Sequence, residues 1–429
     1  MRYDCVIIGG GLSGLTCGIR LAETGASVAV ISTGMSALHF SSGSIDLFGY
    51  NGEGRTVYRP FEFLDEFVGS NPRHPYALCG ARQVREALFY FRGQLDLEGI
   101  ELYNNDESNH FHVTTLGTLK PTFFSQRSVF NEKIRLAFEK KSMIAALNFE
   151  GYRDFYPELA VINLRRNVLF RNIEIITGKI VYPDYGDPQR NPFEYRSVDI
   201  ARIFDTERYL EELAVQIRNA ASGAAFAAMP AFLGISNFKR HHKLLQELTG
   251  LLIYEIPTLP PSILGMRIDN ALKSRFASLG GVYIAGDTVT GGSISGERLE
   301  SVVTENGGGS ALSAGSFVLA TGSFFSGGLV SEFSRVREPV LDLKVYSDAE
   351  RSRWYAPEFF PRRGHPFLEY GVETDERLNP KTGDGRRVKN LYCTGALLPY
   401  YNPIKEGSGG GVAVSTGYRA AELILEGNS

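Results

Sequence analysis

Cysteine is scarce in this chain, which carries four in 429 residues. Cys5, Cys17, Cys79 and Cys393 lie far apart and form no C-x-x-C pair. This spacing excludes a zinc or iron–sulfur site of ordinary pattern within the chain, so we predict that it holds no metal. The few scattered cysteines also indicate a reducing compartment, and we expect a cytoplasmic protein.

An excess of charge of either sign is also missing, because 45 basic side chains face 48 acidic ones. This balance gives no general reason to expect a nucleic acid or an anionic membrane surface as a partner. The most apolar later stretches, residues 221–234 and 310–325, are too short and too rich in serine and glycine to cross a bilayer. We therefore predict no nucleic-acid partner and no direct membrane span.

Glycine, in contrast, is abundant, with 47 residues, and its best-organised group lies near the N-terminus. Residues 3–8 form an apolar, β-branched run of strand length that stops at a glycine turn, residues 9–11. Residues 12–24 then show helical spacing of apolar side chains, and residues 27–31 are typical of a second strand. The pattern predicts a βαβ unit of about 30 residues.

Within this unit Gly9, Gly11 and Gly14 match the pattern G-x-G-x-x-G. The first glycine permits the turn, the second lets a pyrophosphate approach the backbone, and the third allows close packing of helix and strand. Free N–H groups at the helix start attract the phosphate. We predict a phosphate-bearing cofactor here, with a purely structural turn as the alternative.

One element of the dinucleotide pattern is absent. An acidic residue is expected at the end of the second strand, where it binds the ribose of the adenosine half. Ser32 and Thr33 occupy that position. Either one of these hydroxyls binds the ribose more weakly, or the ligand lacks the adenosine half.

The polar loop at residues 35–50 is placed to cross back over a bound cofactor. Its hydroxyls and exposed amides at Ser41, Ser42, Gly43 and Ser44 suit phosphate or ring oxygens. A solvated serine-rich turn explains the same residues equally well. His39, just before them, is either a donor facing the cofactor ring or a buried, satisfied histidine.

Strand and helix patterns alternate again from about residue 142, with strands at 142–149 and 251–256, and helices at 198–220 and 262–279. A proline- and asparagine-rich link, residues 182–192, lies between them. We predict an α/β chain whose Rossmann-like domain is discontinuous, with residues 1–124 as its first part and 281–429 as its return part. Residues 125–280 form an inserted α/β lobe for substrate or partner.

The segment at residues 257–267, PTLPPSILGMR, joins the last strand and helix of that lobe. Ser262 follows two prolines and is a candidate N-cap, while Arg267 lies about one turn further on. An anion held between the cap amides and Arg267 is one interpretation. A proline-stiffened turn with a solvent-exposed arginine is the other.

The return part contributes three glycine-containing strand ends or helix starts. A buried strand at residues 317–320 ends in Thr321 and Gly322, and a strand at residues 390–394 opens on Gly395. A glycine-rich helix start, residues 407–411, follows and presents exposed N–H groups. We expect this helix start to face whatever binds between the lobes.

Taken together, these segments resemble the flavin-dependent oxidoreductases of the fumarate-reductase and succinate-dehydrogenase type. The matching parts are the glycine turn, FVLATG at residues 317–322, and the run from residue 371 to 417 that contains VKNLYCTGALL and EGSGGGVAVSTG. The resemblance implies a flavin-binding Rossmann-like domain. The cofactor residues that it implies are Gly9, Gly11, Gly14, Thr321, Gly322, Gly395, Gly410 and Gly411.

The chain is more closely similar to the B subunits of anaerobic glycerol-3-phosphate dehydrogenases. SALHFSSGSIDL at residues 36–47, PTLPPSILGMR, ATGSFFSGGLV at residues 320–330, REPVLDL at residues 337–343 and GSGGGV carry this similarity. The resemblance implies a catalytic dimer of A and B subunits, attached to the inner face of the membrane by an iron–sulfur C subunit. Such a complex oxidises sn-glycerol 3-phosphate to dihydroxyacetone phosphate and passes electrons to quinone, then fumarate or nitrate.

The same family is described with FMN, which fits the missing carboxylate at Ser32 and Thr33, and FAD is the alternative. For the chemistry, candidates for the base are His39 and His365, and candidates for the phosphate clamp are Arg267 and Arg337. Each of the four can also be structural. The rival interpretations are a flavin-carrying electron-transfer or scaffold subunit whose partner binds the substrate, and an NAD-linked dehydrogenase.

Overall fold

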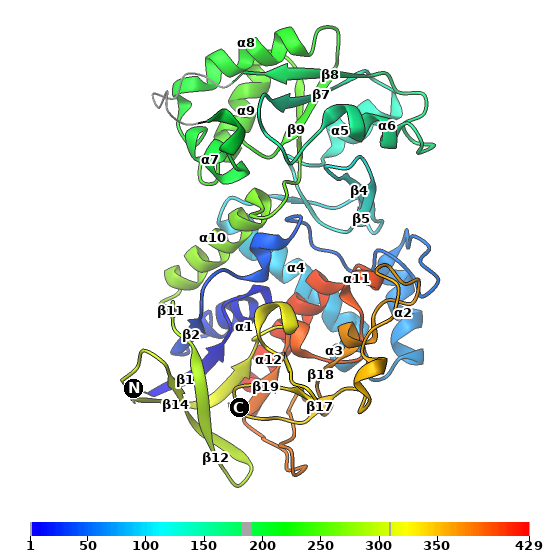
Figure 1. Cartoon of the computed structure of the whole chain (residues 1–429). Helices are drawn as coiled ribbons and strands as arrows, with labels where there is room; N and C mark the ends of the chain where they lie inside the picture. Colours follow the sequence, from blue (N-terminus) through cyan, green and yellow to red (C-terminus); the bar gives the residue numbers. More distant parts are fainter. Residues whose placement is uncertain (1, 182–190, 309, 429) are drawn as a thin grey trace.

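The computed structural model describes residues 2–181, 191–308 and 310–428. Figure 1 shows two lobes, one above the other, with both chain termini in the larger lower lobe. Most of the predicted link at residues 182–192 falls outside the described residues. The two lobes correspond to two clusters of buried apolar side chains.

The lower lobe is built on a sheet in the order β11-β2-β1-β14-β13-β12, with β19 also paired to β14. Neighbouring strands from β11 to β14, and β14 with β19, run parallel, while β12 and β13 pair antiparallel. The strands are β1 (Arg2–Ile8), β2 (Val28–Ser32), β11 (Val282–Ala285), β12 (Val289–Ser295), β13 (Arg298–Thr304), β14 (Ala311–Leu319) and β19 (Leu391–Cys393). The parallel part confirms the predicted Rossmann-like α/β fold.

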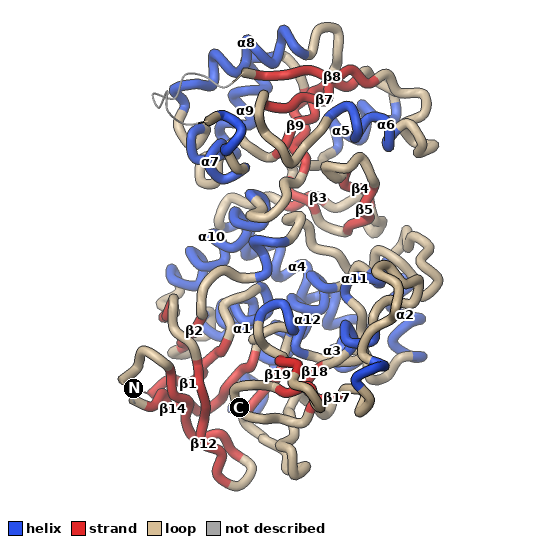
Figure 2. Tube along the Cα trace, viewed as in Figure 1, coloured by secondary structure: helices blue, strands red, loops and turns tan. Residues whose placement is uncertain are grey.

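Four long helices accompany this sheet (Figure 2). Helix α1 packs against both α12 and α10, and α12 also packs against α4. Their bounds are α1 (Leu12–Ala22), α4 (Ala81–Leu97), α10 (Ile263–Ser278) and α12 (Gly409–Asn428). Further helices complete the lobe: α2 (Pro60–Ser70), α3 (Pro75–Cys79) and α11 (Pro403–Glu406). Because β1 enters the glycine turn and α1 leaves it, the turn lies at the carboxyl edge of the parallel strands.

The upper lobe contains a second parallel sheet, in the order β10-β9-β7-β8. Its strands are β7 (Ile144–Phe149), β8 (Ile175–Ile180), β9 (Phe226–Pro230) and β10 (Leu252–Ile256). Its helices are α5 (Glu132–Glu139), α6 (Pro157–Leu164), α7 (Ser197–Ile203), α8 (Leu210–Ala220) and α9 (Phe238–Thr249). β7 and β9 are buried throughout, as expected for central parallel strands.

Short two-stranded pieces fill the remaining chain. The hairpin of β4 (His110–Val113) and β5 (Leu119–Thr122) lies between the two lobes in Figure 1. The other pairs are β3 (Leu102–Tyr103) with β6 (Ser125–Gln126), β15 (Val330–Ser331) with β16 (Val336–Arg337), and β17 (Val345–Tyr346) with β18 (Gly371–Val372).

Helix α10 belongs to both lobes. Ile263 and Leu264 in its first turn are part of the upper apolar cluster, whereas Ile268, Leu272 and Phe276 are part of the lower one. The division of the chain at residues 124/125 and 280/281 stays a prediction. The structure adds that the helix closing the inserted segment is shared between the two cores.

One predicted long helix is shorter than expected. The pattern over residues 198–220 forms two helices, α7 and α8, with a short 3-10 turn at Glu207–Tyr209 between them. Apolar residues at helical spacing continue across the break, at Ile203, Leu210, Leu213 and Ile217. Spacing alone therefore did not reveal the interruption.

Candidate functional site

The glycine turn combines closed and open positions. A Cβ on Gly9, whose φ is +115°, would lie 2.2 Å from Ala320 O, and one on Gly14 would lie 2.0 Å from Gly9 O. Both positions therefore require glycine for packing. A Cβ on Gly11 would meet no atom within 4 Å, so the backbone there faces open space. This is the geometry that a phosphate needs to approach the start of α1.

Unpartnered hydroxyls surround this turn. Among the described residues, Ser13 Oγ, Thr321 Oγ1 and Thr394 Oγ1 are buried without a hydrogen-bond partner. They follow the carboxyl ends of β1, β14 and β19, which are neighbours in the sheet. Ligands of open parallel sheets bind at this edge. A flavin phosphate would supply the missing acceptors, so the residues present fit the cofactor's phosphate side.

The other predicted residues at these strand ends have plain structural partners. Gly322 and Gly395 both adopt positive φ, +82° and +69°. Gly395 N donates to Thr416 Oγ1 at 2.8 Å. These conformations and this hydrogen bond fix the turns at Gly322 and Gly395, which lie beside the glycine turn of residues 9–11. They do not by themselves test cofactor binding, which stays a prediction for these two glycines.

The end of β2, where the ribose carboxylate is absent, is partly covered. Ser32 Oγ donates to Gly34 O at 3.2 Å, and Thr33 is exposed. Tyr283, on β11, reaches across toward the glycine turn: a Cβ on Gly10 would lie 2.3 Å from Tyr283 Oη. The Tyr283 hydroxyl is buried and has no partner among the described residues. An aromatic side chain therefore lies beside the predicted ribose position.

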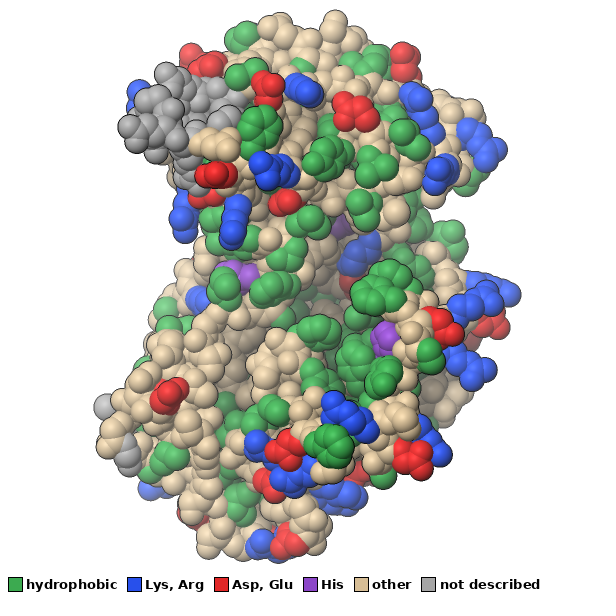
Figure 3. All heavy atoms as spheres, viewed as in Figure 1, with side chains coloured by type: hydrophobic (Ala, Val, Ile, Leu, Met, Phe, Trp, Pro, Cys, Tyr) green, Lys and Arg blue, Asp and Glu red, His purple; other side chains and the backbone are tan. Residues whose placement is uncertain are grey.

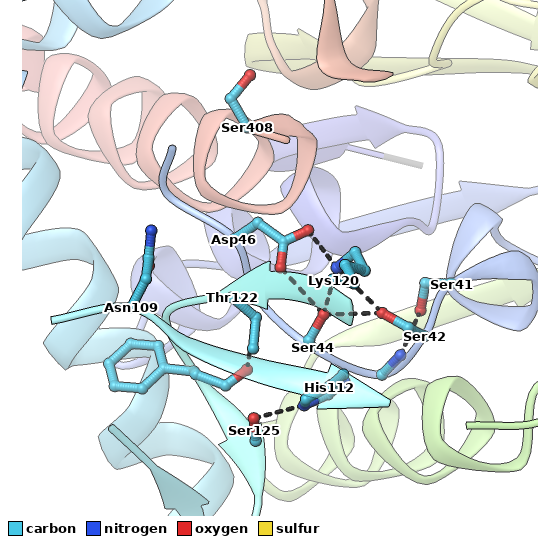
Figure 4. Close-up of polar contacts among 12 residues, drawn as sticks. Ser41, Ser42, Ser44, Asp46, Asn109, His112, Lys120, Thr122, Ser125 and Ser408 are labelled. Atoms are coloured by element: carbon cyan, nitrogen blue, oxygen red, sulfur yellow. Dashed lines mark hydrogen bonds and ion pairs between the residues drawn. The ribbon is translucent and has the colours of Figure 1, made fainter. Parts of the chain in front are cut away.

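The serine loop is tied to a lysine that the sequence interpretation missed (Figure 4). Lys120 on β5 donates to Asp46 Oδ2 at 2.5 Å, to Ser44 Oγ at 2.8 Å and to Ser42 Oγ at 3.3 Å. Ser44 Oγ donates to Asp46 Oδ1 at 3.0 Å. We call Ser42, Ser44, Asp46 and Lys120 the Lys120 cluster. It joins the loop of the lower lobe to the hairpin between the lobes.

The rest of this loop is held by its own backbone and by α10. Ser41 Oγ donates to Leu38 O at 2.9 Å and accepts from Gly43 N at 3.2 Å. Gly43 has a φ of +68°, and a Cβ there would lie 2.3 Å from Leu264 Cβ. These contacts explain Ser41 and Gly43 by loop shape. The prediction that they bind cofactor stays untested.

The start of α12 packs on the same loop. Gly411 N donates to Asp46 O at 2.8 Å, and a Cβ on Gly411 would lie 2.2 Å from Tyr76 Oη. A Cβ on Gly410 would lie 3.3 Å from Asp46 N. Close approach of the loop thus accounts for glycine at both positions. Figure 4 shows Ser408, just before this helix, on the opposite side of Asp46 from the hairpin.

His39 forms a pair with a buried carboxylate. Its Nε2 lies 3.1 Å from Asp269 Oδ2, and Asp269 also accepts from Ser36 Oγ at 2.9 Å and from Lys273 Nζ at 2.6 Å. A carboxylate held in this way fixes the ring orientation of a histidine that donates to it. His39 Nδ1 is buried and has no partner in the described part of the chain. It is the nitrogen left to accept a proton.

His365, the second predicted base, has both ring nitrogens engaged by nearby backbone. Nδ1 accepts from Ala356 N at 3.2 Å, and Nε2 lies 3.2 Å from Phe359 O. These bonds fix a loop and leave no free basic nitrogen. The structure therefore argues against His365 as the base.

The two predicted phosphate-binding arginines are also engaged elsewhere. Arg267 is fully buried: Nη1 donates to Glu255 Oε2 at 2.6 Å, and Nε and Nη2 donate to Gly234 O at 3.0 and 2.7 Å. Burial alone would raise the pKa of Glu255, but the adjacent guanidinium holds it below the ordinary value. Arg337 donates to Glu332 Oε1 at 2.8 Å. The Arg267 prediction is contradicted by its burial, and Arg337 is in an ion pair.

Two cavities lie away from the glycine turn. A small one of about 20 Å³ is enclosed by apolar side chains of the upper lobe. A larger one of about 660 Å³ is lined by charged residues of the lower lobe that include Arg73, Glu373, Arg377 and Arg387. A hollow is also visible between the lobes, with basic and histidine side chains in it (Figure 3).

Comparison with known proteins agrees with this architecture. Residues 4–412 match the family model described as an FAD binding domain. The B subunit of the anaerobic glycerol-3-phosphate dehydrogenase of Aliivibrio fischeri (strain MJ11) is 38% identical over 437 residues, covering 99% of this chain and 96% of that protein. The protein of the same name from Actinobacillus pleuropneumoniae serotype 5b (strain L20) is 37% identical over 429 residues, covering 99% of each. This chain belongs to that family.

Membership of the B-subunit family confirms the resemblance and makes the chain a flavoprotein of the oxidoreductase class. The matching domain is named for FAD, so the comparison supports a flavin but not the predicted preference for FMN. Among solved structures, the 3-ketosteroid delta1-dehydrogenase from Sterolibacterium denitrificans is similar at 9% identity, with a TM-score of 0.44, over 99% of this chain and 100% of that one.

Two further observations concern metal and membrane. In residues 2–181, 191–308 and 310–428, no three histidine, cysteine or acidic side chains gather as metal ligands would. No helix in the same ranges combines the length and apolar character that crossing a membrane requires.

Lys120 and the histidines of β4 were not among the predicted site residues. The sequence HFHV at residues 110–113 did contain a signal, because alternating residues of a strand point to the same face. The contact between Lys120 and the serine loop joins residues 74 apart or more and had no local signal.

Proposed function

We propose that this chain oxidises sn-glycerol 3-phosphate to dihydroxyacetone phosphate with a bound flavin, in a complex that passes electrons to quinone and on to fumarate or nitrate. The observation that carries the proposal is the open backbone position at Gly11, where a phosphate can approach, together with the partly exposed lysine of the Lys120 cluster, in a chain of the B-subunit family. An anionic alcohol and a flavin are the ligands that these two features suit.

For the cofactor, we propose that Gly9, Gly11 and Gly14 hold the flavin phosphate, with Thr321 and Gly322 beside it. A bound flavin would supply the two-electron acceptor for the hydrogen on the alcohol carbon. We propose FMN, because Tyr283 lies against Gly10 and no carboxylate follows β2. Heat extraction and chromatography beside FMN and FAD tests this. An FAD peak would contradict the FMN assignment and leave the flavin assignment intact.

For the substrate, Lys120 replaces the two arginines as the proposed contact of the phosphate group. Its side chain is 32% exposed, so an anionic ligand can compete with Asp46 for its N–H groups. His39 is the proposed base. Asp269 orients its ring through Nε2, and its Nδ1 is free to accept the hydroxyl proton.

For the assembly, we propose an A subunit as catalytic partner and an iron–sulfur C subunit that holds the complex at the inner face of the membrane. Four phenylalanines of the lower lobe, Phe325, Phe333, Phe359 and Phe360, are 79% to 90% exposed. Arginines at positions 351, 353, 362 and 363 lie among them in sequence. Exposed phenylalanine and arginine together are enriched at protein interfaces, which supports a protein partner.

A second candidate function is a flavin-carrying electron-transfer or scaffold subunit whose partner binds the substrate. The burial of Arg267 against Glu255 favours it, because this predicted clamp is closed to a phosphate, and Arg337 is paired with Glu332. Under this alternative the Lys120 cluster would have only a structural role.

Flavin bleaching separates the two. The chain should be purified with and without its A subunit, and its visible spectrum followed on anaerobic addition of sn-glycerol 3-phosphate. Bleaching of the flavin bound to this chain is expected if it is catalytic. An oxidised spectrum at saturating substrate, in both preparations, would overturn the catalytic proposal. Flavin bands in either preparation would exclude the nicotinamide alternative.

A further inference from the structure

The larger cavity of the lower lobe, of about 660 Å³, has no part in the function proposed above. One wall comes from the start of α3, residues 72–78, and the rest comes from residues between 373 and 400, after β18. Figure 2 shows α3 and β18 in the same part of the lower lobe. None of the residues that line the cavity belongs to the glycine turn or to the Lys120 cluster. Its volume lies in the range of about 300–1,000 Å³ that is usual for small-ligand sites.

Two of the three acidic residues that line this cavity are paired with basic residues. Glu373 Oε2 lies 2.7 Å from Lys344 Nζ, and Asp375 Oδ2 lies 2.8 Å from Arg387 Nε. Asp375 Oδ1 also accepts from two backbone N–H groups, at 2.9 and 3.0 Å. These two carboxylates are therefore occupied within the fold. The third, Glu376, is exposed and forms no ion pair among the described residues.

The basic residues of the lining are less fully paired. Arg73 and Lys381 form no ion pair in the part of the chain that the structure describes, and both are exposed. Arg377 has only a distant ion pair, in which its Nη1 lies 3.8 Å from Glu426 Oε2. Three cations therefore share the lining with the single available carboxylate of Glu376. This positive excess favours an anionic ligand.

Arg73 is held in place by an aromatic ring, so its charge stays available. Its guanidinium carbon lies 4.3 Å from the centroid of the Tyr400 ring. That ring packs in turn on Tyr346, with ring centroids 4.4 Å apart. A guanidinium over an aromatic ring keeps N–H groups at its edge, where they can bind a carboxylate or a phosphate in bidentate fashion. The contact with Tyr400 therefore positions Arg73 for an acidic group.

Apolar side chains also line the cavity: Pro72, Pro75, Leu78, Leu398 and Pro399. They can contact carbon atoms of a ligand, and ligand pockets commonly combine such surfaces with a few polar groups. Arg73 comes from one wall, whereas Arg377 and Lys381 come from a distant part of the chain. The cations thus lie in two walls of a cavity that is partly apolar. An organic anion with an acidic group at each end matches this distribution.

We propose that this cavity is a second anion-binding site, which takes a small organic molecule with an acidic group at each end of a short carbon chain. One acidic group binds Arg73, and the other binds Lys381 and Arg377. Glu376 weakens the binding by repulsion. Two probes represent this class: glutarate carries two carboxylates, and 3-phosphoglycerate carries a carboxylate and a phosphate. The site does not depend on the proposed alcohol oxidation, so the two proposals can fail separately.

Calorimetric titration of the purified full chain with each probe tests the proposal. Saturable binding of at least one probe is expected, and the tighter probe shows whether the site prefers a phosphate or a second carboxylate. Butyrate has a short carbon chain but only one carboxylate, so it should bind at least about ten-fold more weakly. Absence of saturable binding for both probes, or equal binding of butyrate, would overturn the proposal.

Substitutions locate the bound anion. Arg73→Met and Lys381→Met should each weaken binding of the tighter probe by about 10- to 100-fold, because each removes a charge-assisted hydrogen bond. Arg82→Met, which removes an exposed ion pair with Glu86 on α4, is the matched control and should leave the dissociation constant unchanged. Lys120→Met should also leave it unchanged. Loss of binding in Lys120→Met but not in Arg73→Met would place the anion at the Lys120 cluster and overturn the second site.

A substitution that strengthens binding guards against a folding defect. Glu376→Gln removes the carboxylate that repels the ligand, so the tighter probe should bind about 2- to 5-fold more tightly than to the parent chain. A gain of this kind cannot arise from loss of structure. Unchanged or weaker binding in this variant, with thermal unfolding as in the parent, would contradict the charge argument on which the site rests.

Discussion

The Lys120 cluster and the Arg267–Glu255 pair use the same attraction between opposite charges, but they differ in access to water. The side chains of Arg267 and Glu255 are both 0% exposed, and their donors and acceptors bond each other or the backbone. Lys120 is 32% and Asp46 14% exposed, and they share hydroxyls that can rotate. We therefore assign the closed pair to the stability of the fold and propose that the open cluster binds an anion.

The glycine turn shows a similar difference between filled and open space. The position of a Cβ on Gly14 is filled by Gly9 O, whereas that of Gly11 is empty. We therefore expect substitutions at closed positions to change stability and substitutions at open positions to change ligand binding. The predictions below test that division.

The largest effect is expected at Gly11. Its backbone has φ −87° and ψ −171°, which any residue adopts, so Gly11→Val should fold but block the phosphate and lose all of its flavin. Visible absorbance per mole of purified chain measures the retention. Gly14→Ala, which collides with Gly9 O, should instead lower the yield of folded protein. A fully flavinated Gly11→Val protein would refute the cradle.

Breaking the closed ion pair comes next. Arg267→Met leaves Glu255 buried without a partner and should cost about 3–5 kcal/mol of unfolding free energy. The double variant Arg267→Met, Glu255→Met should recover much of that loss, because no charge remains to be solvated. Arg337→Met, which breaks a half-exposed pair with Glu332, is the matched control and should cost less than about 1 kcal/mol. Denaturant unfolding followed by circular dichroism measures all three.

Removing the lysine of the Lys120 cluster should affect substrate affinity more than stability. Lys120→Met should change stability by less than about 1 kcal/mol, but weaken binding of sn-glycerol 3-phosphate by about 10- to 100-fold, the loss of a charge-assisted bond. Titration of the flavin spectrum with the substrate gives the dissociation constant. Lys239→Met removes another partly exposed ion pair, with Glu101, and should leave the constant as it was. Equal affinities in the two variants would favour the scaffold alternative.

The smallest effect concerns the buried histidines. An unfolded histidine has a pKa near 6.5, whereas that of His110 is lowered to about 3. Below pH 6.5 the unfolded chain therefore binds protons that the folded chain does not, and stability falls as the pH falls toward 3. The slope is about 1.4 kcal/mol per pH unit for each such histidine, and it vanishes above pH 6.5. His110→Gln should reduce the slope measured between pH 6 and 5 by that amount.

Much of the fold could be predicted because its signals are local. The strand, turn and helix around Gly9, Gly11 and Gly14 can be predicted from consecutive residues of the sequence. Close approach of the backbone explains why glycine is needed at Gly9 and Gly14. The alternation of strands and helices likewise predicted a further α/β lobe, and the structure has a second parallel sheet in that part of the chain. Between α7 and α8 the helix breaks while apolar residues continue at helical spacing, so the periodicity gave no signal of the break.

The roles of the charged residues were harder to predict, because the sequence does not show which residues the fold brings together as ion-pair partners. Arg267 looks like a phosphate clamp until the fold brings Glu255 to its guanidinium. Lys120 looks like an ordinary hairpin residue until the serine loop closes on it. The motif that contained His39 was identified, yet Asp269, which orients its ring, lies 230 residues away.

Helix α10 has a consequence for how the two lobes can move or be separated. Its first turn lies in one core, the rest in the other, and Asp269 lies just past that junction, bound to His39. Helix α10 packs against α1, the helix that begins at the glycine turn. A tilt of the upper lobe would therefore also move the part of α10 that contacts α1. For the same reason, excising the inserted segment would remove part of the lower lobe's own interior, so the lobe is a structural member of the chain and not a detachable module.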